Sequence, residues 1–482
     1  MRAVRWRRCA RWPVQSTNNP VRGVQLPDAN TRSQAMGHLS FLTRAEIESL
    51  GPPIPEDLEE AGVSEAFLRD LALKSVAELP EVTSAAVAER LHLPCALAEE
   101  LLYRLYREKL IEMRLQSSAG ATRYAMLDQG WERLVRMESK SRYSGPAPVS
   151  LADYSHMVRL QAAPSQPASI EAVRAAFSDL VLPESLLQTL GCVINSRSSL
   201  FLTGLPGTGK TAVSERINVA LSGSIWIPYA VEIDGYIIRI FDTRCHRPIT
   251  KKSPSLEHDR RWVEIERPVI RVGGEFTLDN TALVWSESVK SYEAPFHMKA
   301  NGGTLIIDDF GRQSAPPHSL LNRWIQPLER RVDFLTLNNG HKIEVPFEQL
   351  VVFSTSFDED EIIDEAFLRR LGYRARIEMP TQTAYLEIFK RAANATNITL
   401  DDDSLNHVLD KYVVENRPMK PCEPRDLLSR VNDVCRFEGR PFQLTPELVD
   451  IAWRNYFGAA HHFDNQPAEV AAVDQARAVV AS

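Results

Sequence analysis

The stretch SLFLTGLPGTGKTAV, residues 199–213, decides the fold. An apolar run leads into Gly204-Leu-Pro-Gly-Thr-Gly209-Lys210-Thr211, which fits the pattern G-x-x-x-x-G-K-T, and a helix-forming segment follows. Glycines have no Cβ, so backbone N–H groups can converge on phosphate oxygens, and a helix N-terminus adds partial positive charge. The stretch therefore predicts a strand, a phosphate-binding loop and a helix.

This loop predicts a site for ATP and Mg²⁺. Lys210 is expected to reach the β and γ phosphates, and the Thr211 hydroxyl to bind the metal. A glycine-rich turn without a ligand is the alternative, which the lysine and threonine in register disfavour. The residues expected to contact the nucleotide are Gly204, Leu205, Pro206, Gly207, Thr208, Gly209, Lys210, Thr211 and Ala212.

A second stretch, GGTLIIDDFGRQ at 302–313, places two adjacent carboxylates after an apolar strand. Two such groups repel each other unless they are exposed or lie beside a cation. Asp308 fits the position of a second Mg²⁺ ligand, and Asp309 the position of a carboxylate that polarises the attacking water. The pair would then serve Mg–ATP.

These two motifs, in this order, resemble the AAA+ ATPases. QLVVFSTSF (349–357) resembles their sensor-1 strand, with Ser356 in place of the usual Asn. The resemblance spans about 170–458, and it implies a parallel α/β core followed by a helical lid. A shorter Asp309 in place of Glu, together with Ser356, leaves ATP binding expected and the speed of hydrolysis open.

Two further stretches extend the likeness to arginines. IDEAFLRRLGYRARI (363–377) resembles the segment that supplies an arginine finger to a neighbouring subunit, with Arg369 slightly ahead of Arg370 as the candidate. EPRDLLSRV (423–431) resembles sensor 2 and places Arg425 on a lid helix. The implied assembly is a homo-oligomeric ring, commonly a hexamer.

A predicted hairpin at 329–356 gives a finer hint. Two β-like runs flank Asn339-Gly340, a dipeptide typical of a type I′ turn, immediately before the sensor-1 strand. This arrangement is similar to the presensor-1 hairpin of the MoxR-like, magnesium-chelatase and enhancer-binding groups. The sequence does not favour one of these groups.

The N-terminal region predicts three helices and a hairpin. Apolar residues at helical spacing cover 63–80, a second helix follows Thr83 or Ser84, and a third begins near Cys95. IEMRL and TRYAML then predict two strands. This layout resembles the winged-helix superfamily. The third helix carries balanced charge, which favours contact with protein over DNA.

Composition limits the classes of function. The chain has 482 residues and a net charge of −7, so no global basic field attracts nucleic acid. No apolar run approaches the ~20 residues that span a bilayer. Six scattered cysteines without a C-x-x-C pair suggest neither a zinc knuckle nor a disulfide framework, and favour a reducing cytoplasm.

We expect six regions along the chain. They are a disordered basic leader (1–40), a winged-helix domain (41–145), a linker rich in Pro, Ser and Ala (146–168), the AAA+ core (169–380), the helical lid (381–460) and a flexible tail (461–482). The leader also has the composition of an organelle transit peptide.

The implied function is remodelling of a protein partner or complex, driven by ATP hydrolysis in a ring. The alternative is a nucleotide-gated DNA-binding or regulatory module that hydrolyses ATP slowly. A P-loop kinase would leave the finger and sensor-2 segments without a purpose. The polar segment 242–262 is interpreted as a solvated loop, Tyr292 and Phe296 as packing residues, and Asp242 with Cys245-His246 fits no zinc pattern.

Overall fold

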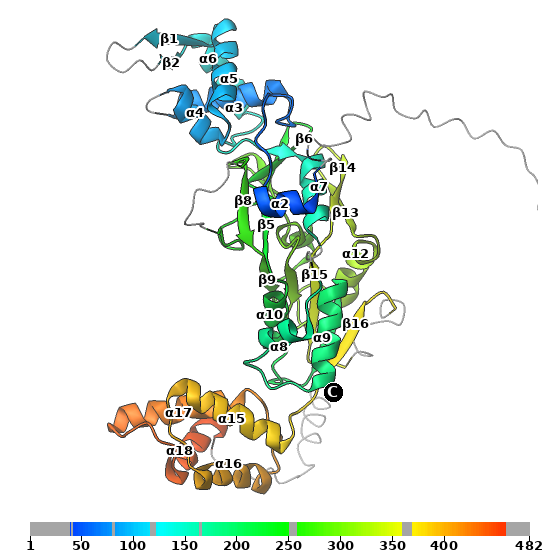
Figure 1. Ribbon diagram of the computed structural model, residues 1–482, viewed down its shortest axis with the longest axis vertical. Coiled ribbons are helices and arrows are strands. Elements are labelled where there is room, and N and C mark those ends of the chain that lie inside the picture. Colours follow the sequence, from blue (N-terminus) through cyan, green and yellow to red (C-terminus); the bar gives the residue numbers. More distant parts are fainter. Residues whose placement is uncertain are drawn as a thin grey trace, which may run out of the picture.

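The computed structural model describes residue 39 and residues 42–79, 82–115, 122–162, 166–249, 258–358 and 369–458. The predicted leader and tail lie almost entirely outside these ranges. Figure 1 shows an elongated molecule, with the N-terminal helices at one end and the C-terminal helices at the other. An α/β region lies between them. No helix within the described ranges is both long and apolar enough to cross a bilayer.

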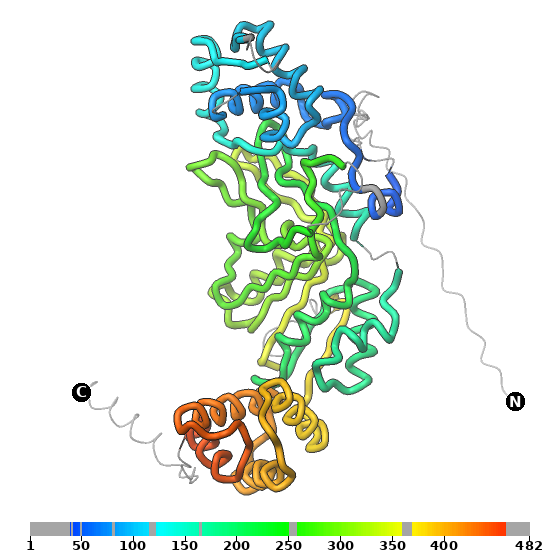
Figure 2. The backbone as a smooth tube through the Cα atoms, turned by 60° about the vertical axis from the view of Figure 1, so that its left-hand side comes forward, coloured from blue at the N-terminus to red at the C-terminus, as the bar shows by residue number. Residues whose placement is uncertain are grey.

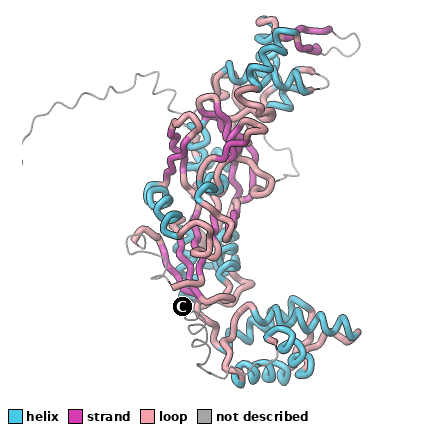
Figure 3. The backbone as a smooth tube through the Cα atoms, turned by 180° about the vertical axis from the view of Figure 1, so that it is seen from behind, coloured by secondary structure: helices cyan, strands magenta, loops and turns pink. Residues whose placement is uncertain are grey.

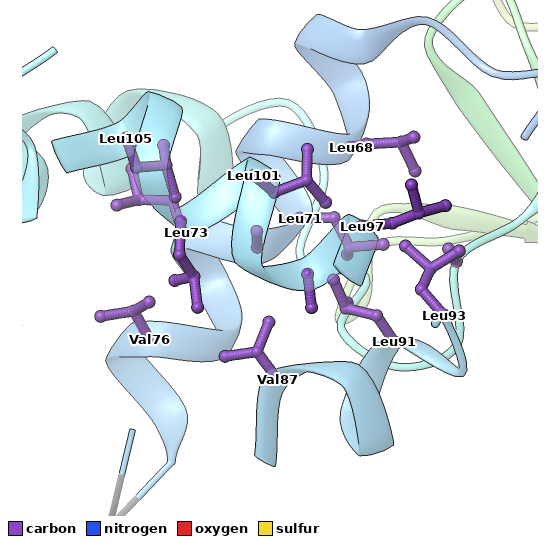
Figure 4. Packing of buried hydrophobic residues seen from close by; sticks show 14 of the residues in the cluster. Leu68, Leu71, Leu73, Val76, Val87, Leu91, Leu93, Leu97, Leu101 and Leu105 are labelled. Carbon is purple, nitrogen blue, oxygen red and sulfur yellow. The ribbon is translucent and has the colours of Figure 1, made fainter. Parts of the chain in front are cut away.

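The N-terminal helices form the predicted three-helix and hairpin arrangement. The elements are α3 (Glu65–Glu78), α4 (Ser84–Leu91), α5 (Cys95–Arg107), β1 (Ile111–Leu115), β2 (Thr122–Met126) and α6 (Asp128–Glu138), with β1 and β2 antiparallel. Thr83 caps α4 by accepting a hydrogen bond from the Ala86 N–H. Leucines from all three helices, including Leu71, Leu91 and Leu101, pack together between them (Figure 4).

The segment 146–168 is not the predicted linker. It forms β3 (Val149–Ser150) and α7 (Leu151–Gln161), and Tyr154 and Met157 are fully buried. Ser150 caps α7 by accepting from the Asp153 N–H. The Pro and Ser residues that suggested a linker flank this short helix. A prediction from composition therefore missed the apolar face of α7. Helix α2 (Arg44–Leu50) also lies outside the three-helix core, because Ile47 packs in the same cluster as Tyr154.

The α/β core confirms the predicted parallel sheet. Its strands are β4 (Leu200–Gly204), β9 (Val269–Val272), β12 (Thr304–Ile307), β15 (Leu350–Thr355) and β16 (Tyr373–Ile377), in the spatial order β16-β4-β15-β12-β9. Every neighbouring pair is parallel. All five carboxyl ends therefore meet at one edge of the sheet, where the loop after β4 also lies.

Helices pack against this sheet. They are α8 (Ile170–Ala176), α9 (Glu184–Ser196), α10 (Lys210–Ala220) and α12 (Pro317–Arg330). Val213 and Ile217 of α10 pack against Ile306 and Val352 of the sheet, and Trp324 of α12 packs near Phe353 in a separate cluster. The strands β4, β12 and β15 are buried at every position, as expected for a sheet covered on two faces.

A second β region joins the core to the three-helix domain. It contains β5 (Ser224–Pro228), β6 (Ala230–Ile233), β7 (Tyr236–Arg239), β8 (Trp262–Glu266), β10 (Val284–Ser286) and β11 (Ser291–Glu293), with the short helices η2 (Leu278–Thr281) and α11 (Phe296–Lys299). One sheet has the order β10-β11-β7-β6-β3, and β5 pairs with β8. Figure 2 shows this region, in green, directly beside the blue N-terminal helices.

The predicted hairpin before β15 is present, but its turn differs. Strands β13 (Val332–Thr336) and β14 (Lys342–Pro346) are antiparallel, and the Leu337 N–H donates to His341 O. Gly340 has φ +81°, whereas Asn339 is not among the residues with positive φ. A type I′ turn needs positive φ at both central residues, so the prediction of that turn was wrong. Leu335 and Val345 are buried against the second β region.

The C-terminal domain is helical, as expected. It consists of α15 (Gln382–Thr396), α16 (Asp402–Val414), α17 (Glu423–Glu438) and α18 (Pro446–Phe457). Its aromatic core includes Tyr385, Tyr412 and Trp453. Figure 3 shows these helices as a group separate from the α/β region. Arg391 ties the group to the core by donating to Ser178 O at 2.7 Å.

Candidate functional site

Three glycines shape the loop between β4 and α10. Gly204 has φ +155°, and a Cβ there would lie 2.6 Å from the backbone oxygen of Ile377. Gly207 and Gly209 have φ +85° and +93°, in the region that other residues rarely adopt. Gly209 is the N-cap of α10, so the first free N–H groups of that helix face the loop. The loop therefore has the backbone of an anion-binding site.

The other predicted loop residues divide by exposure. Leu205 and Pro206 are exposed, Thr208 is buried and donates from Oγ1 to Leu205 O, and Ala212 is half-buried in the first turn of α10. Leu205 is 51% exposed. An exposed apolar residue at this position leaves the loop accessible from solvent.

Lys210 lies at the centre of the site. Its ammonium donates to Gly204 O at 2.8 Å, to Leu205 O at 3.1 Å and to Ser356 Oγ at 3.0 Å. Burial lowers the pKa of this amine, whereas the nearby charges of Asp309 and Asp308 raise it. Carbonyl dipoles only partly replace the water that a buried ammonium loses. A phosphate beside the loop would supply the missing negative charge.

Two hydroxyl groups converge on Asp308. Thr211 Oγ1 donates to Asp308 Oδ2 at 2.9 Å, and Ser354 Oγ donates to Asp308 Oδ1 at 2.9 Å. The Thr211 hydroxyl and the Asp308 carboxylate are oxygen ligands of the kind that Mg²⁺ prefers, and Thr211 directly follows the loop lysine. The residues present therefore fit the predicted metal position. Ser354 is buried and orients the carboxylate from β15.

Asp309 lies in a strained backbone position. Its φ is +49°, although it is not glycine, and its side chain is exposed at the carboxyl edge of the sheet. Its N–H donates to Asp308 Oδ1 at 3.2 Å, and the next N–H, of Phe310, donates to Ser354 O at 2.7 Å. Such strain persists only where the surroundings enforce it, and it is concentrated at functional sites. The bend leaves Asp309 exposed while the neighbouring Asp308 is half-buried.

The end of β15 presents one of two hydroxyls to the site. Ser356 contacts Lys210, as described above, whereas Thr355 Oγ1 donates to Phe310 O at 2.7 Å and is fully buried. Neighbouring residues on a strand point to opposite sides. Ser356 is therefore the residue placed to contact a ligand, and Thr355 supports the bend after Asp309.

The described contacts of the three predicted arginines do not include Lys210. Arg370 Nε lies 2.5 Å from Glu329 Oε1 on α12. Arg425 Nε lies 3.2 Å from Asp426 Oδ1, and its side chain is largely exposed. Arg369 is exposed just before β16. The predicted segment 363–377 is described only from residue 369 onward.

The helical domain reaches the loop through residues that the motifs did not identify. A Cβ on Gly207 would lie 2.7 Å from Cys422 Sγ and 3.4 Å from Lys420 Cδ. Cys422 is the N-cap of α17, so the start of this helix, which includes Arg425, lies next to the loop between β4 and α10. Ser354, Lys420 and Cys422 are separated in sequence from the loop, and a local pattern gives no signal for them.

The polar segment near Cys245 is structural rather than a metal site. The His246 ring accepts at Nδ1 from the Asp242 N–H and donates from Nε2 to Lys299 O. Both ring nitrogens are thus engaged, and no metal-binding group of three or more His, Cys, Asp or Glu residues occurs in the described part of the chain. Tyr292 is buried and Phe296 packs against the core, as predicted for packing residues.

The chain resembles known proteins only in part. A family model described as a domain of unknown function (DUF8689) matches residues 381–455, which is the C-terminal helical domain. No curated protein matches the chain.

Among solved structures, NtrX from Brucella abortus in complex with ADP is similar with a TM-score of 0.38 and 15% identity. The match covers 61% of this chain and 60% of that one. The NtrX complex with ATP gives a TM-score of 0.36 at 15% identity, with the same coverage. A point mutant of RuvB from Thermotoga maritima gives 0.34 at 13% identity, covering 61% of this chain and 74% of that one. The chain thus spans about 60% of the length of the NtrX chains that it matches.

Proposed function

We propose that this protein is an AAA+ ATPase that binds Mg–ATP at residues 204–212 and hydrolyses it. One observation carries the proposal: Lys210, Thr211, Asp308 and Ser356, which follow three different strands, meet at the carboxyl edge of the sheet. The lysine would bind the β and γ phosphates, and Thr211 with Asp308 would hold Mg²⁺. When bound, the metal would neutralise charge on the phosphates.

Asp309 is proposed as the carboxylate that orients and polarises the attacking water. It is exposed at the edge of the sheet beside the Mg²⁺ ligand, and its own negative charge acts on Lys210. Ser356 would orient the water or a phosphate oxygen through its hydroxyl. Both side chains are shorter than the Glu and Asn usual in the resembled family, so we expect turnover at the slow end of the family.

We further propose that full turnover requires a homo-oligomeric ring, in which a neighbouring subunit completes the site. Nucleotide binding itself does not require the ring. Arg369 or Arg370 would act as a finger in the neighbouring subunit, and Arg425 as sensor 2. Positive charge placed beside the transferring phosphoryl group would then couple hydrolysis to movement of the helical domain. The hexameric number and a cytoplasmic location are part of this proposal.

The N-terminal domain is proposed as a winged-helix adaptor for a protein partner. Helix α5, in the position of a recognition helix, has Arg104 paired with both Glu65 and Glu100. Its outward residues include Tyr103 and Tyr106, which are 50% and 43% exposed. The neutralised Arg104 and the exposed tyrosines favour a protein surface over a phosphate backbone.

The test is steady-state ATP hydrolysis by the full chain with Mg²⁺. Asp309→Asn is expected to lower kcat by about 10²–10⁴-fold, the usual effect of losing a positioned acid–base group. Asp358→Asn is the matched control, because Asp358 is an exposed carboxylate just beyond β15 that pairs with Arg376. It should leave kcat nearly unchanged.

Three results would overturn parts of the proposal. Failure of the wild-type chain to bind ATP would exclude the nucleotide site. Tight binding with equal, negligible turnover in wild type and Asp309→Asn would exclude the motor and leave ATP as an assembly switch. Stimulation of turnover by duplex DNA, rather than indifference to it, would favour the nucleic-acid alternative over a protein partner.

A further inference from the structure

The side chain of Gln313 makes several hydrogen bonds within the loop after Asp309. Gln313 is 9% exposed, and its Nε2 donates to Asp308 O at 3.0 Å and to Asp309 O at 3.3 Å. Its Oε1 accepts from the Gly311 N–H at 2.9 Å. These bonds fix the backbone of the loop. Arg312 lies in this loop, so its backbone is held near Asp308 and Asp309.

Arg312 projects from this loop over an aromatic ring. Its guanidinium carbon lies 5.4 Å from the centre of the Phe357 ring, the residue after Ser356. Cation–π stacking of this kind orients a guanidinium without neutralising it. Within the described ranges, no carboxylate lies within ion-pair distance of Arg312, and the residue is exposed.

Arg312 lies at the same edge of the sheet as Lys210. Its N–H donates to Asp309 O at 3.0 Å, and its guanidinium stacks on Phe357. The residue before Phe357, Ser356, contacts Lys210 at 3.0 Å. By contrast, Arg370 pairs with Glu329, and Arg425 pairs with Asp426. Arg312 is thus an exposed cation, with no ion-pair partner in the described ranges, near the residues proposed to bind the phosphates.

We propose that Arg312 contacts the γ-phosphate of ATP bound to its own chain, and makes the site prefer ATP to ADP. The inference rests on the proposed nucleotide site and adds a residue that no motif assigns. An exposed cation at the edge of the site is stabilised by a polyanion, and a triphosphate carries one more phosphoryl group than a diphosphate. Phe357 is the positioning residue, because its ring fixes the guanidinium.

The experiment is isothermal titration of the full chain with a non-hydrolysable ATP analogue, AMP-PNP, and with ADP, both with Mg²⁺. Arg312→Ala is expected to weaken AMP-PNP binding roughly 10- to 100-fold, the usual effect of losing a hydrogen bond to a charged group. ADP binding should change far less. Phe357→Leu, which keeps an apolar side chain, should give a smaller loss of AMP-PNP affinity and leave ADP unaffected.

Arg436→Ala provides the matched control, since Arg436 is an exposed arginine in the last turn of α17, far along the helix from Cys422. It should change neither affinity. Equal losses for AMP-PNP and ADP in Arg312→Ala, or no loss for either, would overturn the inference while leaving the nucleotide site standing. A wild-type chain that binds neither nucleotide would overturn both proposals. Unchanged melting temperatures would establish that each variant is folded.

Discussion

Gly204→Ala is expected to destabilise the nucleotide-free protein more than Gly209→Ala, although both change a positive-φ glycine in the same loop. The added Cβ at position 204 would lie 2.6 Å from Ile377 O and 3.0 Å from Thr208 Oγ1, whereas position 209 has no heavy atom within 4 Å. Positive φ costs about 1–3 kcal/mol at either site. Overpacking against the backbone adds about 1–3 kcal/mol at position 204 only.

The difference between the two variants is therefore the informative quantity. The change in unfolded-state entropy from glycine to alanine is common to both and cancels. Urea denaturation without nucleotide, followed by far-ultraviolet circular dichroism, should show Gly204→Ala less stable by about 1–3 kcal/mol. Equal midpoints, or a less stable Gly209→Ala, would refute the claim that β16 closes directly over Gly204.

Three other contacts carry predictions of their own. Ser354→Ala should weaken Mg²⁺-dependent nucleotide binding by about tenfold but spare binding in EDTA, because Asp308 loses one of its two hydroxyl donors. Tyr412→Phe should lower the unfolding free energy of the helical domain by about 1–3 kcal/mol in urea, since its hydroxyl donates to the buried carboxylate of Glu423 at 2.7 Å. Hydrogen bonds from Arg244 hold the pKa of Asp242 well below its usual range. The stabilisation from Asp242 should therefore be fully present above about pH 4 and be lost as pH falls further. In urea denaturation at a series of pH values, Asp242→Asn should destabilise the protein at neutral pH but have little effect at the acid end.

The sequence predicted the parts of the site that are local in the chain. The loop from Gly204 to Thr211 follows from spacing alone, because strand, glycines, lysine and helix are consecutive. Asp308 was expected at the same edge for a similar reason: it ends an apolar strand, and carboxyl ends of parallel strands share an edge. Thr211 follows β4 and Asp308 follows β12, and β15 lies between these strands in the sheet. The two side chains are nevertheless 2.9 Å apart, as expected when the carboxyl ends share an edge.

Contacts between distant segments were not predictable in this way. Ser354 reaches Asp308 only because β15 lies beside β12 in register, with Ile307 opposite Phe353. Cys422 faces Gly207 only because the helical domain packs against the loop. A single sequence contains no signal for either pairing.

Local sequence gave a wrong prediction in two regions. The Pro and Ser residues around 146–168 favoured a linker, but the short helix inside it buries Tyr154. Asn339-Gly340 favoured a two-residue turn, but the hairpin closes with a longer loop in which Gly340 alone adopts positive φ. In both cases tertiary packing overrode a local preference.

The core of the three-helix domain is completed by Ala230 and Ile237, which come from β6 and β7, far along the chain from the point where that domain ends. Buried Arg261 adds a further tie, donating from Nη1 to Ala61 O at 2.6 Å. Recombination at the boundary near residue 145 would leave these pieces behind and expose apolar surface on both products. Exchange of this N-terminal domain between lineages would therefore require the second β region to be inherited with it, as one evolutionary unit.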